Sequence, residues 1–249
     1  MSAKQGIVIP VYNHGKTAGS LVENLSRLGL PVIIVDDGSN EDTKSCLEKI
    51  YSSCSLTVPV RLNKNSGKGR AVYEGIKKAA ELGLSHVLQI DADGQHDISR
   101  AGFFLGESAA RPDALICSYP VYDDSVPGSR EKGRVVANTW AKIVTLSNDI
   151  KESMLGFRVY PVEPVLSICN RHYIDFRMGF DIEILVRLHW KNIPFIFYPV
   201  GVSYPCDGIS HFKPVLDNVR ISWVFTRLCC AMIPKIPALL IRRWKKDRS

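Results

Sequence analysis

The first half of the chain alternates short apolar, β-branched runs with longer stretches of helical periodicity, and no other feature constrains the fold as much. Strands that alternate with helices of this length indicate βαβ units, and therefore a mostly parallel sheet with helices on both faces. The sequence thus predicts an α/β fold. The expected strands are Ile7–Val11, Val32–Val35, Val58–Leu62, His86–Ile90 and Ala114–Ser118, and the expected helices are Thr17–Leu28, Glu41–Tyr51, Gly69–Leu82 and Ile98–Ala110.

The alternation ends near Ser125, and the rest of the chain is organised differently. Fewer elements are expected there: helices at Arg134–Leu146 and Asp181–Trp190, and short extended pieces at Phe195–Tyr198 and Val200–Tyr204. The last segment is first apolar and aromatic, and then strongly basic. The simplest division is one main domain over residues 1–212 and a helical tail over residues 213–249.

Charge and cysteine content bear on the cellular setting. The net charge of +7 favours an anionic partner, such as nucleic acid, a phosphorylated substrate or an acidic membrane surface. The seven cysteines are odd in number, scattered and never in a C-x-x-C pair, which argues against a disulfide framework and against a zinc site. Reduced thiols, and an N-terminus without the apolar stretch of a signal peptide, predict a cytoplasmic protein.

Polar loops follow the first four predicted strands: "YNHG", "DDGSN", "NKNSGKG" and "DADGQH". The carboxyl ends of parallel strands lie at one edge of the sheet, where ligands bind, so these loops predict one binding site. The third loop is neither of two common phosphate-binding motifs: Val72 replaces the last small residue of a dinucleotide fingerprint, and Leu62 replaces the first Gly of a P-loop. Gly67 and Gly69 still allow close backbone approach, and Lys68 adds a charge. A helix-entry loop with a solvated Lys is the alternative.

Asp91, Asp93 and Gln95 stand at alternate positions directly after an apolar run. Side chains alternate across a strand, so these three groups point to one side if the extended conformation continues. Two carboxylates and an amide oxygen are hard ligands suited to Mg²⁺ or Mn²⁺, and adjacent carboxylates repel each other unless a cation joins them. The alternative is an Asp-rich turn in which Asp97 caps the next helix.

Six motifs occur in a fixed order: "IVIPVYN", "VDDGS", "NSGKGRAV", "QIDADGQH", "GFRVYP" and "FDIEILVRL". Together they resemble the family 2 glycosyltransferases of the GT-A fold, in the branch that includes dolichyl- and polyprenyl-phosphate sugar transferases. The resemblance covers residues 6–212 and implies a GT-A type, Rossmann-like, mostly parallel sheet flanked by helices, with the tail as a helical appendage. It also implies a metal-dependent enzyme with a nucleotide-sugar donor, which usually inverts the anomeric centre.

The resemblance further assigns roles to individual residues. Those implied to bind the nucleotide sugar are Pro10, Tyr12, Asp37, Lys68 and Asp91, and those implied to hold Mg²⁺ or Mn²⁺ are Asp91, Asp93 and Gln95. Three positions depart from the family pattern. His14 stands where many relatives have Glu, Glu152 where they often have Asp, and Leu155 where a smaller residue is expected.

Basic side chains are expected near the donor. Sugar transfer from a nucleoside diphosphate builds negative charge on the leaving diphosphate, which a metal ion stabilises as a Lewis acid. Positively charged side chains add to this stabilisation, and Arg130, Arg134 and Arg158 are the candidates, with Arg130 grouped among the nucleotide-sugar ligands and Arg158 among the catalytic residues. For each of them the alternative is an ordinary surface or helix-end charge.

Catalytic carboxylates depend on the acceptor, because a hydroxyl acceptor needs a general base and a phosphate acceptor does not. Asp181 and Glu183 of "FDIE" fall on a predicted helix, where they do not share a face. Only one of them is therefore expected to point into the site. Asp181 is the candidate, with helix capping as its alternative, and Glu152 is a further option.

Two other functions remain open from the residues alone. A nucleotidyltransferase also uses an Asp-held metal on a similar sheet, but it usually has a Gly-rich basic loop after strand one, where this chain has "YNHGK". An RNA-binding module would interleave aromatic and basic residues on one face. The basic residues concentrate instead at the C-terminus, so we expect no nucleic-acid partner.

The tail, Ile221–Ile241 with its basic end, predicts contact with a membrane. About 20 apolar residues suffice for a span. Arg227 and Lys235 each cost roughly 2.5–3.5 kcal/mol near the bilayer centre, and two prolines are expected to break the helix, so a span is not expected. The basic residues around Trp244 instead predict a peripheral protein on the anionic inner face of the cell membrane, where it would meet a lipid-linked acceptor. The alternative is a helical pair folded onto the main domain.

Overall fold

The structure is a computed structural model that describes residues 3–122, 128–203 and 214–246, except for the side chains of residues 128–131 and 214–215. Its centre is a seven-stranded sheet in the order β3-β2-β1-β4-β6-β5-β7. Only β6 runs antiparallel to its neighbours, so the predicted mostly parallel α/β sheet is confirmed. The strands are β1 Gln5–Val11, β2 Val32–Asp36, β3 Thr57–Arg61, β4 His86–Gln89, β5 Leu115–Tyr122, β6 Arg158–Pro161 and β7 Phe195–Val202.

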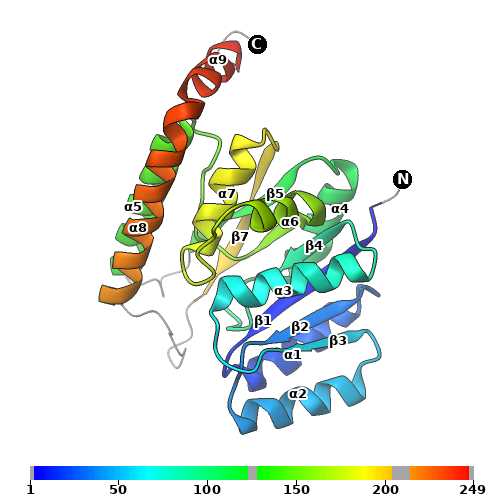
Figure 1. Cartoon of the computed structure of the whole chain (residues 1–249). Helices are drawn as coiled ribbons and strands as arrows, with labels where there is room; N and C mark the ends of the chain where they lie inside the picture. The colour runs from blue at the N-terminus through cyan, green and yellow to red at the C-terminus, as the bar shows by residue number, and fades with distance from the viewer. Residues whose placement is uncertain (1–2, 123–127, 204–213, 247–249) are drawn as a thin grey trace.

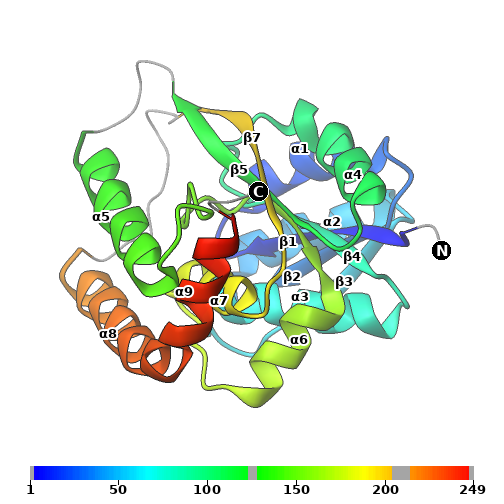
Figure 2. The same ribbon diagram turned by 90° about the horizontal axis from the view of Figure 1, so that it is seen from above.

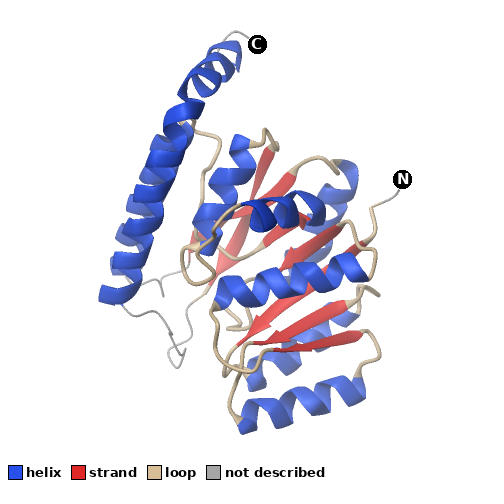
Figure 3. Ribbon diagram, in the orientation of Figure 1, coloured by secondary structure: helices blue, strands red, loops and turns tan. Residues whose placement is uncertain are grey.

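Helices cover both faces of the sheet, which forms the middle layer in Figures 1 and 3. Neighbouring residues of β1 point to opposite faces: Val8 joins the core under α3, α5, α6, α7 and α8, and Ile9 joins the core under α1, α2 and α4. The helices are α1 Gly15–Ser26, α2 Glu41–Ser53, α3 Lys68–Glu81, α4 Ala101–Ala110, α5 Gly128–Thr145, α6 Val162–Arg171, α7 Phe180–Trp190, α8 Pro214–Met232 and α9 Ile236–Lys246.

The second half of the chain contains elements that the sequence did not predict. Strand β6 is only four residues long and pairs with both β4 and β5, so it inserts an antiparallel strand into the middle of the sheet. Helix α6 follows directly, and Pro164 lies in its first turn, where a backbone N–H has no helical partner. The two extended pieces expected between Phe195 and Tyr204 form one strand, β7.

The tail is helical over the part that the structure describes. α8 continues through a 3₁₀ turn at Ile233–Lys235 into α9 (Figure 1). The α-helix is interrupted where the two prolines were expected to break it, since Pro234 lies within the 3₁₀ turn and Pro237 within the first turn of α9, but the chain keeps a helical path. By length and composition, the 31 residues Leu216–Lys246 are sufficient to cross a membrane. The inner face of α8 nevertheless belongs to the core of the main domain through Val224, Phe225 and Leu228.

Candidate functional site

A cleft of about 1590 Å³ lies along the carboxyl edge of the sheet and continues between α5 and α8. One side, called here the sheet wall, consists of Pro10, Tyr12, Asp37, Lys68, Asp91, Asp93 and Gln95. The other side, the helical wall, comes from α5 and α8 and carries both apolar side chains (Val136, Ala137, Trp140, Ile221, Phe225 and Cys229) and polar or charged ones (Lys132, Arg134, Asp217, Asn218, Arg220, Ser222 and Thr226). The sheet wall unites the residues that the sequence analysis assigned to the nucleotide sugar and to the metal, apart from Arg130, whose side chain lies outside the described residues.

The start of the sheet wall is organised by Asp37, which follows β2. Its carboxylate accepts hydrogen bonds from the backbone N–H of Ser66 (2.7 Å) and of Gly67 (2.8 Å). Burial raises the pKa of Asp37, and these two hydrogen bonds partly oppose the rise. Asp37 thereby ties the loop after β2 to the loop before α3. Gly67 has a φ of +104°, which an L side chain rarely adopts, and this conformation leads directly into Lys68.

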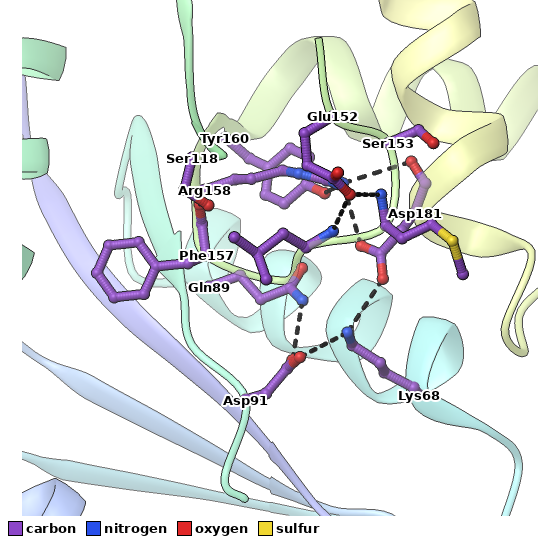
Figure 4. Close-up of polar contacts among 12 residues, drawn as sticks. Lys68, Gln89, Asp91, Ser118, Glu152, Ser153, Phe157, Arg158, Tyr160 and Asp181 are labelled. Carbon is purple, nitrogen blue, oxygen red and sulfur yellow. Dashed lines mark hydrogen bonds and ion pairs between the residues drawn. The ribbon is translucent and has the colours of Figure 1, made fainter. Parts of the chain in front are cut away.

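Lys68 is the centre of a half-buried cluster of ion pairs (Figure 4). Its Nζ lies 2.8 Å from Oδ2 of Asp91 and 3.0 Å from Oδ2 of Asp181. Nη1 of Arg158 lies 3.2 Å from the second oxygen of Asp181, so two cations alternate with two carboxylates. Burial alone lowers the pKa of Lys68, but the two carboxylates outweigh it and raise that pKa above its ordinary value. Burial likewise opposes ionisation of Asp91, yet Lys68 holds the pKa of this carboxyl below its usual range.

The loop after β4 does not continue as an extended strand. Residues 92–94 form a turn, Gly94 has a φ of +73°, and the carboxylate of Asp93 accepts a hydrogen bond from the N–H of Gln95 (3.1 Å). The predicted alternation is therefore wrong, because Gly94 adopts the left-handed conformation and Asp93 closes the turn. Asp97 caps the following 3₁₀ helix, as the alternative proposed. The turn nonetheless leaves Asp91, Asp93 and Gln95 lining the cleft.

The same loop decides which groups fit a metal ion. The oxygens of Asp91 accept from Lys68 (2.8 Å) and from the side-chain amide of Gln89 (3.3 Å). Among the described residues there is no group of three His, Cys, Asp or Glu side chains placed to hold a metal. The donor set that fits Mg²⁺ or Mn²⁺ is therefore small: the carboxylate of Asp93 and the amide oxygen of Gln95. Such an ion commonly completes its coordination with water and substrate phosphate.

The loop before β6 presses against the ion pairs. A Cβ atom on Gly156 would lie 2.4 Å from Oδ2 of Asp91 and 2.6 Å from Nζ of Lys68. Only a residue without a side chain fits there. Glu152 holds this loop in place: it is buried and accepts from Arg134 (2.9 Å) and from the N–H of Leu155 (3.0 Å).

All three predicted catalytic residues, Asp181, Glu152 and Arg158, lie behind the cleft surface rather than on it. Glu152 does not line the cleft, and its oxygens are occupied by hydrogen bonds to α5 and to the loop before Gly156. Arg158 is fully buried in β6 and reaches the site only through Asp181. Arg134 does line the cleft. The geometry thus gives Glu152 and Arg158 positions from which they orient other groups.

Asp181 and Glu183, two residues apart on α7, face different parts of the molecule, as the helical spacing predicted. Asp181 points to Lys68 and Arg158, and it makes no capping hydrogen bond. Glu183 is fully buried and binds Arg187 on its own helix (2.8 Å) and Arg227 on α8 (2.8 Å). The first turn of α7 therefore connects the ion pairs of the cleft with the tail.

Sequence reasoning missed Arg177 and the helical wall. Arg177 lies in the loop before α7, lines the cleft and places Nη1 3.5 Å from Oδ1 of Asn65. The motif "FDIEILVRL" begins at Phe180, three residues after Arg177. Trp140 of α5 packs against Phe225 of α8, with ring centroids 5.9 Å apart, and closes the helical wall. The available signal was the apolar content of α5, which does not reveal what the helix faces.

The chain matches a known protein family. Residues 6–173 match the family model described as glycosyl transferase family 2. The chain belongs to this family. The predicted family is thus confirmed, and membership of glycosyl transferase family 2 identifies the protein as a glycosyltransferase rather than a nucleotidyltransferase.

Relatives of this glycosyltransferase point to the same branch. It is 32% identical over 234 residues to an uncharacterised protein of Methanocaldococcus jannaschii, covering 88% of this chain and 98% of the relative. It is 32% identical over 103 residues to the UDP-N-acetylglucosamine–dolichyl-phosphate N-acetylglucosaminyltransferase of Methanococcus voltae, covering 36% of this chain and 41% of that one. It is 24% identical over 224 residues to the polyprenol monophosphomannose synthase of Mycolicibacterium smegmatis, covering 86% and 82%.

Solved structures share the fold of this glycosyltransferase. The mannosyltransferase PcManGT of Pyrobaculum calidifontis, solved with GDP-Man and Mn²⁺, superimposes with a TM-score of 0.59 at 14% identity, covering 96% of this chain and 76% of that one. TarS of S. aureus, residues 1–349, superimposes with a TM-score of 0.55 at 18% identity, covering 80% and 60%. The predicted GT-A architecture is therefore confirmed.

Proposed function

We propose that this glycosyltransferase moves a sugar from a nucleotide-sugar donor to a lipid-linked phosphate acceptor at the cytoplasmic face of the cell membrane. The observation that carries the proposal is the chemical contrast between the two walls of the cleft. The sheet wall is polar and charged and includes Lys68 and Asp91 of the ion-pair cluster, whereas the helical wall adds a group of apolar side chains that the sheet wall lacks.

The sheet wall suits a nucleoside diphosphate sugar. The loops after β1 and β2 border the cleft with Tyr12 and Asp37, and Lys68 begins α3. The N-terminus of a helix favours negative charge, and Lys68 adds its own charge at the same place. Arg177 lines this end of the cleft as well, so anionic phosphates between Lys68 and Arg177 would be met by cations from two sides.

Asp93 and Gln95 would hold Mg²⁺ or Mn²⁺ beside the donor diphosphate. A divalent ion there stabilises the negative charge that develops on the leaving diphosphate. The residues of the chain orient the groups around this position: Asp37 fixes the loop before Lys68, and Glu152 fixes the loop that carries Gly156. The structure of a neighbour with GDP-Man and Mn²⁺ on the same fold supports this assignment.

The reaction is a direct displacement with inversion. An oxygen of the acceptor attacks the anomeric carbon, the bond from that carbon to the donor phosphate breaks, and the nucleoside diphosphate leaves with the electron pair. A phosphate oxygen attacks without losing a proton, so no general base is needed. Asp181 agrees with a reaction that needs no general base, because its two oxygens are already bound to Lys68 and Arg158.

The names of two relatives support a lipid phosphate as the acceptor. One is described as a dolichyl-phosphate N-acetylglucosaminyltransferase and another as a polyprenol monophosphomannose synthase. The apolar side chains of the helical wall agree with that class of acceptor, since an isoprenoid chain packs favourably against apolar side chains and a phosphate does not. The tail is apolar and long enough to cross a membrane, which agrees with an enzyme that acts at a lipid surface.

The test is product analysis with the purified full chain. A thermal-shift panel of nucleotide sugars, with and without Mn²⁺, first identifies the donor. That donor is then supplied with a polyprenyl phosphate or with the matching polyprenol in detergent, and the lipid products are identified by mass spectrometry. We expect a sugar phosphate lipid from the polyprenyl phosphate only, and none in EDTA. Transfer to the alcohol alone, or full activity in EDTA, would refute the acceptor or the metal part of the proposal respectively.

A further inference from the structure

The outer surfaces of α5, α8 and α9 expose an unusual amount of apolar side chain. Val135 on α5 is 60% exposed and Trp223 on α8 is 61% exposed. Helices α5 and α8 lie side by side (Figure 2), and Trp140 meets Phe225 between them. The exposed apolar residues, called here the docking face, are Val135, Val136, Trp140 and Ile143 on α5, Leu216, Val219 and Trp223 on α8, and Ile233, Leu240, Ile241 and Trp244 beyond it.

Four basic residues of the tail contact the main domain. Arg227 donates to Glu183 (2.8 Å) and to the backbone oxygen of Tyr173 (3.2 Å). Lys235 lies over the ring of Trp190, and Arg242 donates to the backbone oxygen of His189 (2.8 Å). Lys246 pairs with Asp149. The tail thus contacts the domain through buried apolar residues and through several of its cations, while further apolar side chains stay exposed on its outer side.

Charge at the margin of the docking face has one sign. Within residues 132–145 and 216–246, where the structure describes the side chains, the single acidic residue is Asp217, and it is buried. Lys132, Lys142 and Lys245 are exposed beside the apolar residues. An apolar centre with a cationic margin complements a phospholipid surface, which offers acyl chains below phosphate groups. A second copy of this chain would bring the same cations against one another.

We propose that α5 and the tail form one face that docks on a phospholipid bilayer, and that α5, part of the catalytic domain, is as necessary for docking as the tail. Apolar insertion supplies most of the affinity, because four of the tail's cations are engaged by the protein itself. The cleft opens between the same two helices, so an acceptor enters it from the lipid side. Docking itself does not depend on the proposed lipid acceptor. Only the purpose of docking, which is to let that acceptor enter the cleft, rests on the proposed function.

Flotation of the full chain with phosphatidylcholine vesicles tests the inference. The informative variant carries Val135→Glu and Ile143→Glu, two exposed positions of α5 that do not line the cleft. The matched control carries Leu28→Glu and Leu82→Glu, exposed apolar positions on the other part of the domain. We expect the wild type to float with neutral vesicles and to remain bound in 1 M NaCl, about tenfold weaker binding for the α5 variant, and wild-type binding for the control.

Other outcomes would overturn the inference. Wild-type binding by the α5 variant would leave docking to the tail alone, and complete release by salt would make the attraction electrostatic. A wild type that ignores vesicles but dimerises in light scattering, with a monomeric α5 variant, would assign the face to a second copy. Circular dichroism and the donor thermal shift confirm that the variants are folded, and the milder pair Val135→Ser and Ile143→Ser should give an intermediate loss. Flotation uses no acceptor, so its result can be interpreted even if the product assay fails.

Discussion

The two walls of the cleft handle charge in opposite ways. On the sheet wall, Lys68 and the carboxylates of Asp91 and Asp181 are gathered into one half-buried cluster in which each charge faces an opposite one. On the helical side, Arg227 pairs with the buried Glu183 away from the cleft, Arg134 and Arg220 line the cleft, and apolar side chains are exposed on the outer surface. The proposed transfer from a diphosphate donor to a lipid-linked acceptor needs both arrangements, since a charged surface suits the donor and an apolar surface suits the lipid chain.

Removal of Asp93 should lower activity more than any other change on the sheet wall. We expect Asp93→Ala to lower kcat/KM more than 100-fold, because the carboxylate is the anionic group that fits a metal beside the leaving diphosphate. The fold should persist, since the one hydrogen bond of the Asp93 carboxylate among the described residues is that from the N–H of Gln95. Steady-state kinetics at saturating Mn²⁺ checks this, with Asp97→Asn in the same loop as control, because Asn caps a helix about as well as Asp. Full activity of Asp93→Ala would remove the metal from the mechanism.

Lys68→Met tests whether the cluster depends on its central cation. Without Lys68, Asp91 and Asp181 face each other across the site, and the uncompensated charges should lower the free energy of unfolding by about 2 kcal/mol. Urea unfolding measures this, and Lys78→Met on the same helix is the control, because its pair with Glu81 is on the surface. Adding Asp91→Asn to Lys68→Met should restore part of the loss. No recovery in the double variant would mean that Lys68 does not act through this carboxylate.

Arg227→Met tests the ion pair that holds the tail to α7. It leaves Glu183 fully buried with Arg187 as its remaining charged partner, so we expect a loss of about 1.5 kcal/mol in the free energy of unfolding. Arg171→Met, at an exposed position on α6, should change it by less than about 0.5 kcal/mol. Equal stability of the two variants would show that the tail is not held to α7 by this ion pair.

Asp181→Asn should have the smallest effect on catalysis, and it sharpens the assignment of the acceptor. If the acceptor is a phosphate, kcat should fall less than tenfold and the pH profile should keep its shape, because no proton is removed in the reaction. A hydroxyl acceptor would instead give a large fall in kcat with little change in the donor KM, as expected for a missing base. Circular dichroism of the variant guards against reading a folding defect as a catalytic one.

The sheet wall could be predicted from sequence for a clear physical reason. Apolar β-branched runs reveal parallel strands, and polar residues directly after them must collect at one edge, so the pattern brings Tyr12, Asp37, Lys68 and Asp93 together. The turn at Gly94 was mistaken for a continuing strand, since alternation of side chains alone does not report backbone conformation.

Contacts between distant segments were beyond the reach of sequence patterns. Lys68 and Asp181 pair only because β6 and α7 return to the sheet edge, and β6 itself is four residues with a buried Arg158. Arg227 was counted as a cost in a bilayer, whereas its partner Glu183 is 44 positions away and was not visible as such. Helical periodicity found the tail, but it did not show which face meets protein and which meets solvent.

Gly156 shows where this enzyme has no room for variation. At position 156 even a methyl group would sit 2.4 Å from Oδ2 of Asp91 and 2.6 Å from Nζ of Lys68, so the ends of both charged side chains would have to move. A Gly156→Ala allele would keep all four charges and still push the central pair apart. In a saturation library selected for activity, position 156 should therefore tolerate fewer substitutions than the charged positions around it, for reasons of space alone.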